Sequence, residues 1–202
     1  MKDIIFATGN KNKMVEIRQI LNDVSPRIES MKEAGIDIDI VEDGSTFEEN
    51  ALIKAKAVYE ECVKRGRPDV IVLADDSGLE IDYLNKEPGI YSSRYGGEDT
   101  SYTIKNQMLL DRLAGVPREK RTARFVCAIA AVQQESDPIV VRGTIEGYIG
   151  DQPAGENGFG YDPIFYVPDL NISTAQLSPE DKNARSHRGN ALRAIRKALK
   201  KD

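Results

Sequence analysis

Hydrophobic and polar residues follow two periods along the chain, one typical of strands and one typical of helices. Residues 3–8 predict a strand. Residues 11–23 predict a helix, because their apolar side chains recur on one face; this stripe consists of Met14, Ile17, Leu21 and Val24. Residues 35–41 alternate between isoleucine and polar positions, which predicts a half-exposed strand.

A second helix is predicted to start at Ser45, with Glu48 completing a capping box three residues later. It runs to about Lys64, and its apolar stripe consists of Ala51, Ala55, Val58 and Cys62. The apolar run 70–74 then predicts a buried strand that ends at two aspartates and a Ser-Gly turn. Residues 79–84 alternate again and predict a further strand.

The second half of the chain predicts a glycine-rich loop at 88–97, a helix over 101–113 and a long hairpin. The hairpin strands are 122–133 and 138–149, and a loop rich in glycine and proline follows at 150–163. Ser178 and Pro179 predict a helix start. A basic C-terminal helix ends the chain, and its inner face consists of Ala191, Leu192, Ile195, Ala198 and Leu199.

This order of elements predicts an α/β fold with a mixed sheet and flanking helices. We expect residues 1–202 to form a single domain with two lobes, the second over roughly 85–150. The composition, with 40% hydrophobic and 30% charged residues, is that of a soluble globular protein. A net charge of −5 argues against a binder of duplex nucleic acid.

The N-terminus is interpreted as a strand and a loop rather than a signal peptide, and the apolar runs are too short to span a bilayer. Cys62 and Cys127 are the two cysteines, each inside an apolar pattern. They are interpreted as buried free thiols, which favours a cytoplasmic protein.

Two adjacent carboxylates, Asp75 and Asp76, follow the 70–74 strand, and Glu42 follows the 35–41 strand. If these strands are neighbours, three carboxylates converge at one edge of the sheet. Carboxylates in such a place can bind Mg²⁺ or take a proton from water. The alternative is that Glu42 and the Asp-Asp-Ser-Gly segment are ordinary polar turn residues.

The loop Thr8-Gly9-Asn10-Lys11-Asn12-Lys13 joins the first strand to the first helix. Its backbone N–H groups and lysines can bind phosphate, although polar residues at a helix start are common. A second glycine-rich loop, residues 155–163, contains Phe159 and Tyr161. These aromatic rings either stack on a base or plug the core.

The segment from Lys182 to Lys201 has eight lysines or arginines and no acidic residue. Part of it is a solvated helix face. Lys182, His187 and Arg188, which we expect away from the helix ends, could bind anionic or carbonyl groups. His187 is the one histidine, so zinc is improbable.

Six motifs in order resemble those of the inosine triphosphate pyrophosphatase family, in its bacterial and archaeal branch. They are Ala7–Lys13, Thr46–Ala51, Ala74–Leu79, Pro88–Tyr95, Gly158–Pro163 and Ser186–Gly189. The resemblance implies an elongated α/β fold with two lobes around a nucleotide-binding cleft, a homodimer and Mg²⁺ dependence. It implies hydrolysis of ITP, dITP and XTP to the monophosphate and pyrophosphate, which removes deaminated purines from the nucleotide pool.

By position, the resemblance places the triphosphate at Thr8, Gly9, Asn10, Lys11, Asn12 and Lys13. It makes Glu42 and Asp76 the Mg²⁺ ligands and Asp76 also the proton acceptor, supported by Asp75 and Lys54, with Ser77 touching substrate. Phe159 stacks on the base, and Gly160, Tyr161 and Asp162 complete its pocket. Lys182, His187 and Arg188 close over the base and phosphates.

Selecting 6-oxo purines requires donors aimed at O6, where adenine carries an amino group. His187, Arg188 or backbone N–H groups could supply them. Two other functions fit part of the sequence: a pyrophosphatase for other modified nucleotides, and a nucleotide-binding sensor without hydrolysis. A sensor needs no acidic cluster, so Glu42, Asp75 and Asp76 together favour an enzyme.

Overall fold

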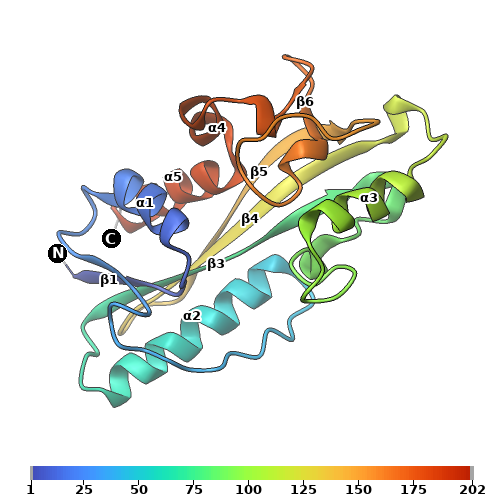
Figure 1. Ribbon diagram of the computed structural model, residues 1–202. Coiled ribbons are helices and arrows are strands. Elements are labelled where there is room, and N and C mark those ends of the chain that lie inside the picture. The colour runs from blue at the N-terminus through green and yellow to red at the C-terminus, as the bar shows by residue number, and fades with distance from the viewer. Residues whose placement is uncertain (1, 201–202) are drawn as a thin grey trace. The chain divides into compact units, whose positions relative to one another are not determined.

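The computed structural model, in which residues 2–200 are described, is an α/β fold built on one mixed sheet (Figure 1). Its strands are β1 (Asp3–Phe6), β2 (Ile28–Ser30), β3 (Val70–Ile81), β4 (Thr122–Val132), β5 (Ile139–Ile149), β6 (Phe165–Val167) and β7 (Ile172–Ser173). The order across the sheet is β2-β1-β3-β4-β5-β6-β7. β1 pairs in parallel with β2 and β3, whereas β6 pairs antiparallel with β5 and β7. The predicted mixed α/β sheet is confirmed.

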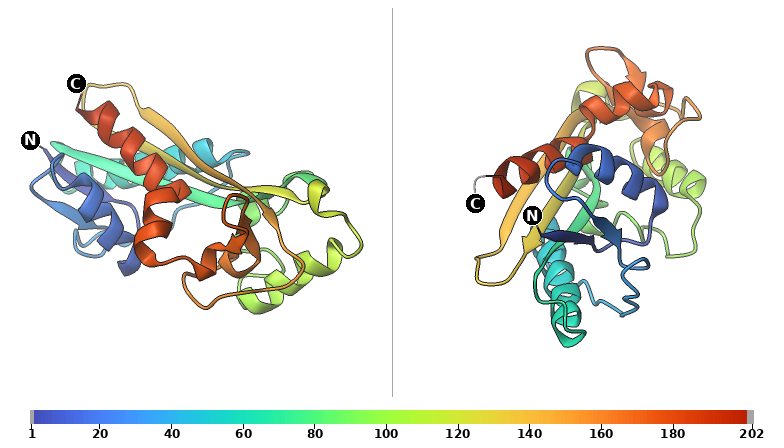
Figure 2. Two further views of the ribbon diagram at one scale, coloured as in Figure 1. Left: turned by 90° about the horizontal axis from the view of Figure 1, so that it is seen from above. Right: turned by 90° about the vertical axis from the view of Figure 1, so that its left-hand side faces the viewer.

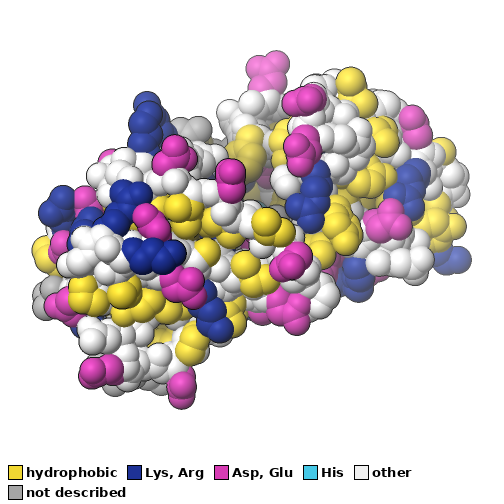
Figure 3. Space-filling view, turned by 90° about the horizontal axis from the view of Figure 1, so that it is seen from below, with side chains coloured by type: hydrophobic (Ala, Val, Ile, Leu, Met, Phe, Trp, Pro, Cys, Tyr) yellow, Lys and Arg dark blue, Asp and Glu magenta, His cyan; other side chains and the backbone are white. Residues whose placement is uncertain are grey.

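The helices of the described chain are α1 (Lys11–Leu21), α2 (Phe47–Lys64), α3 (Tyr102–Arg112), α4 (Pro179–Arg185) and α5 (His187–Leu199). Each predicted helix is present. None combines the length and apolar composition that a membrane span requires. Acidic and basic side chains are interspersed on the face shown in Figure 3, in keeping with the small net charge.

The chain divides into two compact units. The first comprises residues 1–76, 127–143 and 188–202, and the second comprises 77–126 and 144–187. Both units are discontinuous in sequence, because β3, β4 and β5 each contribute residues to both. The division into two predicted lobes, the second over 85–150, stays a prediction.

The core of the first unit lies where α1 and α5 cover one face of its strands (Figures 1 and 2). The predicted stripe of α1 faces this core, with Ile17 and Leu21 fully buried. On α5, Ala191, Leu192 and Ile195 are buried, whereas Ala198 and Leu199 are only partly covered. The stripe of α2 is buried as well. Figure 1 shows α2 against the opposite face of the strands from α1 and α5.

The core of the second unit forms between α3 and the strands beside it. Leu109 and Leu113, at the end of α3, pack with Leu79, Ile149 and Phe165. The helix begins at Ser101, whose hydroxyl accepts a hydrogen bond from the Ile104 N–H. The predicted hairpin is present as β4 and β5, which are neighbours in the sheet.

One strand prediction and one turn prediction are wrong. Residues 36–44 contain no strand, although burial still alternates along them: Ile36 is buried and Asp37 exposed. The alternation reflects an extended segment lying against the protein, without a neighbouring strand to complete a ladder. The predicted Ser77-Gly78 turn is also absent, because β3 runs without interruption from Val70 to Ile81.

Two helix starts also differ from prediction. Thr46, not Ser45, caps α2, and its hydroxyl accepts from the Glu49 N–H at 3.1 Å. Glu49 reaches back to the N–H and hydroxyl of Ser45, while Glu48 pairs with Arg142. The C-terminal basic segment is divided at Ser186, which ends α4 as its C-cap. His187 and Arg188 therefore open α5 and do not lie away from helix ends.

Candidate active site

Two adjacent carboxylates lie inside β3 and face opposite sides of the sheet. Successive side chains of a strand alternate between its faces. Leu73 belongs to the core beneath α1 and α5, so Asp75 shares that face. Asp76 lies on the other face, where it meets a side chain of α2. One strand thus places two carboxylates in different surroundings.

Asp75 is buried between two cations of the first unit, with 3% of its surface exposed. Lys13 Nζ lies 2.9 Å from Asp75 Oδ2, and Arg188 Nε lies 3.6 Å from the same oxygen. Burial by itself raises the pKa of a carboxyl group. Lys13 and Arg188 outweigh that effect and hold the pKa of Asp75 below its ordinary value, so this carboxylate stays ionised.

At Asp76 the effect of burial on the pKa exceeds that of the neighbouring cation and hydrogen bond. Burial raises its pKa to about 6, and the charges of Glu42 and Asp75 act in the same direction. Lys54 and a hydrogen bond from Asn50 Nδ2 at 3.2 Å oppose the shift without cancelling it. A carboxyl group with this pKa can accept a proton near neutral pH.

Lys54 connects the acidic residues of this face. Its Nζ lies 3.0 Å from Glu42 Oε2 and donates to the Asp75 carbonyl oxygen at 3.1 Å. Glu42 is thereby linked through Lys54 to the backbone of β3, although the segment that carries it is not a strand. The predicted convergence of three carboxylates is wrong, because the side chain of Asp75 lies on the face of β3 opposite to Asp76.

The loop before α1 is an open helix start. Thr8 Oγ1 accepts from the Asn10 N–H, and Asn10 Oδ1 accepts from the Lys13 N–H, each at 3.2 Å. Gly9, Asn10 and Lys11 are exposed, whereas Thr8 is buried. The side chain of Asn12 lies outside the described residues. Such a helix start can bind an anion through its backbone N–H groups.

The chemistry of Glu42 and Asp76 fits a divalent cation, to which water and substrate phosphates add further ligands. Among residues 2–200 there is no group of three or more His, Cys, Asp or Glu side chains that could hold a metal ion. Mg²⁺ needs no such group, because it usually binds through one or two carboxylates, water and substrate phosphates. Glu42 and Asp76 would supply two such carboxylates.

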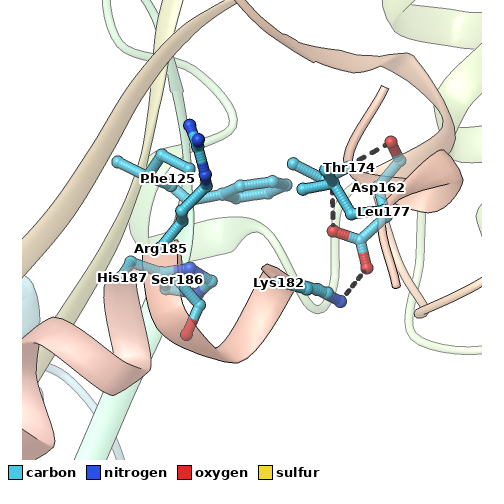
Figure 4. Close-up of a pocket in the computed structure, with 9 residues that line it drawn as sticks. Phe125, Asp162, Thr174, Leu177, Lys182, Arg185, Ser186 and His187 are labelled. Carbon is cyan, nitrogen blue, oxygen red and sulfur yellow. Dashed lines mark hydrogen bonds and ion pairs between the residues drawn. The ribbon is translucent and has the colours of Figure 1, made fainter. Parts of the chain in front are cut away.

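In the second unit, Asp162 is a buried carboxylate with three hydrogen-bond donors, of which Figure 4 shows Thr174 and Lys182. Its Oδ2 accepts from Lys182 Nζ at 2.5 Å and from the Phe159 N–H at 2.8 Å. Its Oδ1 accepts from Thr174 Oγ1 at 2.8 Å. Asp162, Thr174 and Lys182 line one pocket together with Ser186 and His187.

The aromatic residues of this unit differ in exposure. Phe159 is 55% exposed, and Lys182 Nζ lies 5.1 Å from the centre of its ring. Tyr161 is buried and donates from its hydroxyl to the Ser92 carbonyl at 2.6 Å, so its ring plugs the core. The His187 ring stacks on Phe125 with centroids 5.1 Å apart. Phe159 is thus the exposed ring among Phe159, Tyr161 and His187.

Sequence comparison agrees with this arrangement. Residues 4–198 match the model of the Ham1 family. The chain belongs to the Ham1 family. The resemblance expected from the six motifs is thereby confirmed.

Relatives of this Ham1 protein cover it almost completely. The dITP/XTP pyrophosphatase of Clostridium perfringens is 46% identical over 200 residues, which are 99% of this chain and 98% of the relative. That of Bacillus subtilis is 44% identical over 199 residues, 98% of each chain. The solved Ham1 structure from Staphylococcus aureus has a TM-score of 0.89 at 42% identity and covers 99% of both chains.

The structure distributes the predicted site residues over both units of the Ham1 chain. The first unit contains Thr8 to Lys13, Glu42, Lys54, Asp75, Asp76 and Arg188. The second contains Ser77, Phe159, Gly160, Tyr161, Asp162, Lys182 and His187. Arg188 contacts Asp75, and also Glu16 at 3.7 Å, so its described ion pairs lie in the first unit.

Two residues of these clusters received no predicted role. Asn50 contacts Asp76, and it lies one helical turn before Lys54 on the same face of α2. That spacing was a usable signal. Thr174 contacts Asp162 from twelve residues away, across β6 and β7, and no sequence period indicates this contact.

The raised pKa of Asp76 has a measurable effect on stability. Below about pH 4, near the pKa of Asp76 in the unfolded chain, Asp76 is protonated in both the folded and the unfolded protein. As pH rises from about 4 to about 6, Asp76 ionises more readily in the unfolded chain, and the free energy of unfolding therefore falls. Asp76→Asn removes this loss. In EDTA we expect the variant to be more stable than the parent by about 2–3 kcal/mol near pH 7.5 and by roughly half as much near pH 5. Urea unfolding at both pH values measures this, and a gain that does not grow with pH would contradict the assignment.

Proposed function

We propose that this Ham1 protein is a dITP/XTP pyrophosphatase, which hydrolyses ITP, dITP and XTP to the monophosphate and pyrophosphate. The observation that carries the proposal is the pairing of an ionised Asp75 with Asp76, whose pKa is raised to about 6 beside Glu42 and Lys54. The names of the relatives from C. perfringens and B. subtilis support the same substrates.

Asp76 is the proton acceptor of the reaction. The oxygen of a water molecule attacks the α-phosphorus, the bond from that phosphorus to the bridging α–β oxygen breaks, and pyrophosphate leaves. The water proton passes to Asp76. Glu42 and Asp76 would hold Mg²⁺, which would offset phosphate charge. Lys54 supports this pair, because it contacts Glu42 and the Asp75 backbone carbonyl.

The loop Thr8 to Lys13 binds the triphosphate. Its exposed Gly9, Asn10 and Lys11 lie at the start of α1, where the helix dipole favours an anion. Lys13 adds charge while it pairs with Asp75. Ser77, the next residue of β3 after Asp76, touches substrate.

The second unit recognises the base. Phe159 stacks on it, because this ring is open to solvent on a loop whose backbone is fixed by Asp162. Gly160 and Asp162 complete the pocket, and Tyr161 supports it from the core. Lys182 and His187 of this unit, and Arg188 of the first unit, supply donors to the base and phosphates. Donors aimed at O6 favour 6-oxo purines over adenine.

We also propose an oligomeric state and a cellular compartment for the protein. The protein acts as a homodimer. Candidate dimer contacts are the β4–β5 hairpin and the Gly89–Gly97 loop, in which Tyr91 is 56% exposed. Cys62 and Cys127 are buried free thiols, and they favour a reducing compartment, the cytoplasm.

Pyrophosphate release from dITP, XTP and dGTP tests the function. We expect release from dITP and XTP in Mg²⁺, little release from dGTP, and none in EDTA. Asp76→Asn is the site control and removes activity without unfolding the protein. Equal release from dGTP would contradict selectivity for deaminated purines and indicate general NTP hydrolysis. Tight dITP binding without pyrophosphate release would indicate a sensor.

Phe159→Ala tests the base contact. Stacking on a base is worth about 1–3 kcal/mol, so KM for dITP should rise roughly tenfold or more with a smaller change in kcat. Tyr83→Ala is the matched control, because Tyr83 is another exposed aromatic residue of the same unit, 51% exposed. An unchanged KM in Phe159→Ala would mean that the ring does not contact the base.

A further inference from the structure

The side-chain amide of Asn50 is buried, and both its nitrogen and its oxygen form hydrogen bonds. It lies near the start of α2 with 1% of its surface exposed. Its Nδ2 donates to Asp76 Oδ2 at 3.2 Å, and its Oδ1 accepts from the Gly44 N–H at 2.8 Å. A backbone N–H can only donate, so the Gly44 contact determines which end of the amide faces Asp76.

Gly44 fits closely against this side chain. A Cβ atom at Gly44 would lie 2.7 Å from Asn50 Oδ1 and 2.8 Å from Glu49 Cβ, far inside normal contact. The residue therefore has no room for a side chain, and its backbone is pressed against the start of α2. Asn50 accordingly connects two segments, β3 and the end of the 36–44 segment.

The hydrogen bond from the Gly44 N–H to Asn50 also affects the position of Glu42, which lies two residues before Gly44. Residues 36–44 form no strand, so ladder hydrogen bonds do not hold Glu42 in place. The contacts shown for this end of the segment come from α2: Lys54 reaches Glu42, and Asn50 reaches Gly44. The amide thereby holds the Glu42 segment and the Asp76 carboxylate from a single point.

We propose that Asn50 is a positioning residue that sets the placement of Asp76 and Glu42 relative to each other. The inference rests on the proposed function, in which these carboxylates bind Mg²⁺ and Asp76 accepts a proton. Asn50 acts through them, because its two amide groups are occupied by Asp76 and Gly44. Side chains that orient a metal-binding carboxylate contribute as much as 10–100-fold, roughly, to metal affinity or activity.

Three variants test this role. Asn50→Ala removes both bonds. Asn50→Asp keeps an acceptor for the Gly44 N–H but places an oxygen, not a donor, against Asp76. Gly44→Ala leaves Asn50 in the sequence and pushes a methyl group against its Oδ1, so it tests the same contact if Asn50→Ala fails to fold.

Val58→Ala is the matched control for simple loss of packing. Val58 is fully buried on α2, two turns beyond Asn50 on the same face. Its truncation loosens the same helix without touching the carboxylates. It should lower Tm and leave kcat unchanged.

We expect Asn50→Ala and Asn50→Asp to lower kcat for dITP by about 10–100-fold, with KM for dITP changed less than about threefold. The Mg²⁺ concentration for half-maximal rate should rise. Mn²⁺ binding, measured by titration calorimetry without nucleotide, should weaken in parallel. The losses from Gly44→Ala and Asn50→Ala should not add in the double variant, because both act on one contact.

Two results would overturn the inference: normal kcat and Mn²⁺ binding in folded Asn50 variants, or a loss in Val58→Ala equal to that in Asn50→Ala. Wild-type protein on dITP is assayed alongside. If wild type itself releases no pyrophosphate, the proposed function fails, and the Mn²⁺ titration still decides whether Asn50 positions the carboxylates.

Discussion

The burial of an ionised Asp75 is the constraint on which the first unit depends. A lone carboxylate in the protein interior costs several kcal/mol or more, roughly, unless cations compensate it. Lys13 and Arg188 provide this compensation from α1 and α5, two helices from opposite ends of the chain. Because Lys13 and Arg188 must both reach Asp75 on β3, this carboxylate fixes the positions of α1 and α5 more specifically than apolar packing alone.

This compensation also separates the roles of two neighbouring residues. With its charge balanced on one face of β3, Asp75 remains an anion throughout the working pH range. Asp76, on the other face, keeps only part of its compensation and is close to gaining a proton at neutral pH. Strand alternation thus converts an Asp-Asp pair into a fixed charge and a titratable group.

The sequence patterns predicted well those elements that have a clear period and a clear boundary. The stripe of α1, the hairpin and the Ser178 helix start follow from local rules, and each is present. Prediction was wrong where tertiary contacts decide. Ser77 and Gly78 are typical turn residues, but pairing in the sheet carries β3 through them. The 35–41 alternation matched a strand, yet no neighbouring strand exists to complete it. The expected convergence of Glu42, Asp75 and Asp76 failed for the same reason, because an uninterrupted β3 turns Asp75 and Asp76 to opposite faces. The contact between Asn50 and Asp76 could have been expected from the helical spacing of Asn50 and Lys54.

The pKa of Asp75 lies below the ordinary aspartate value and the pKa of Asp76 lies above it. A ¹³C NMR titration of the side-chain carboxyl carbons in metal-free protein measures both directly, with Asp76→Asn to assign the signals. We expect Asp76 to titrate near pH 6 and Asp75 to show no titration over the range in which the protein stays folded. Titration of Asp76 near its ordinary value, about 4, or protonation of Asp75 before Asp76, would show that the two carboxylates do not have these separate roles.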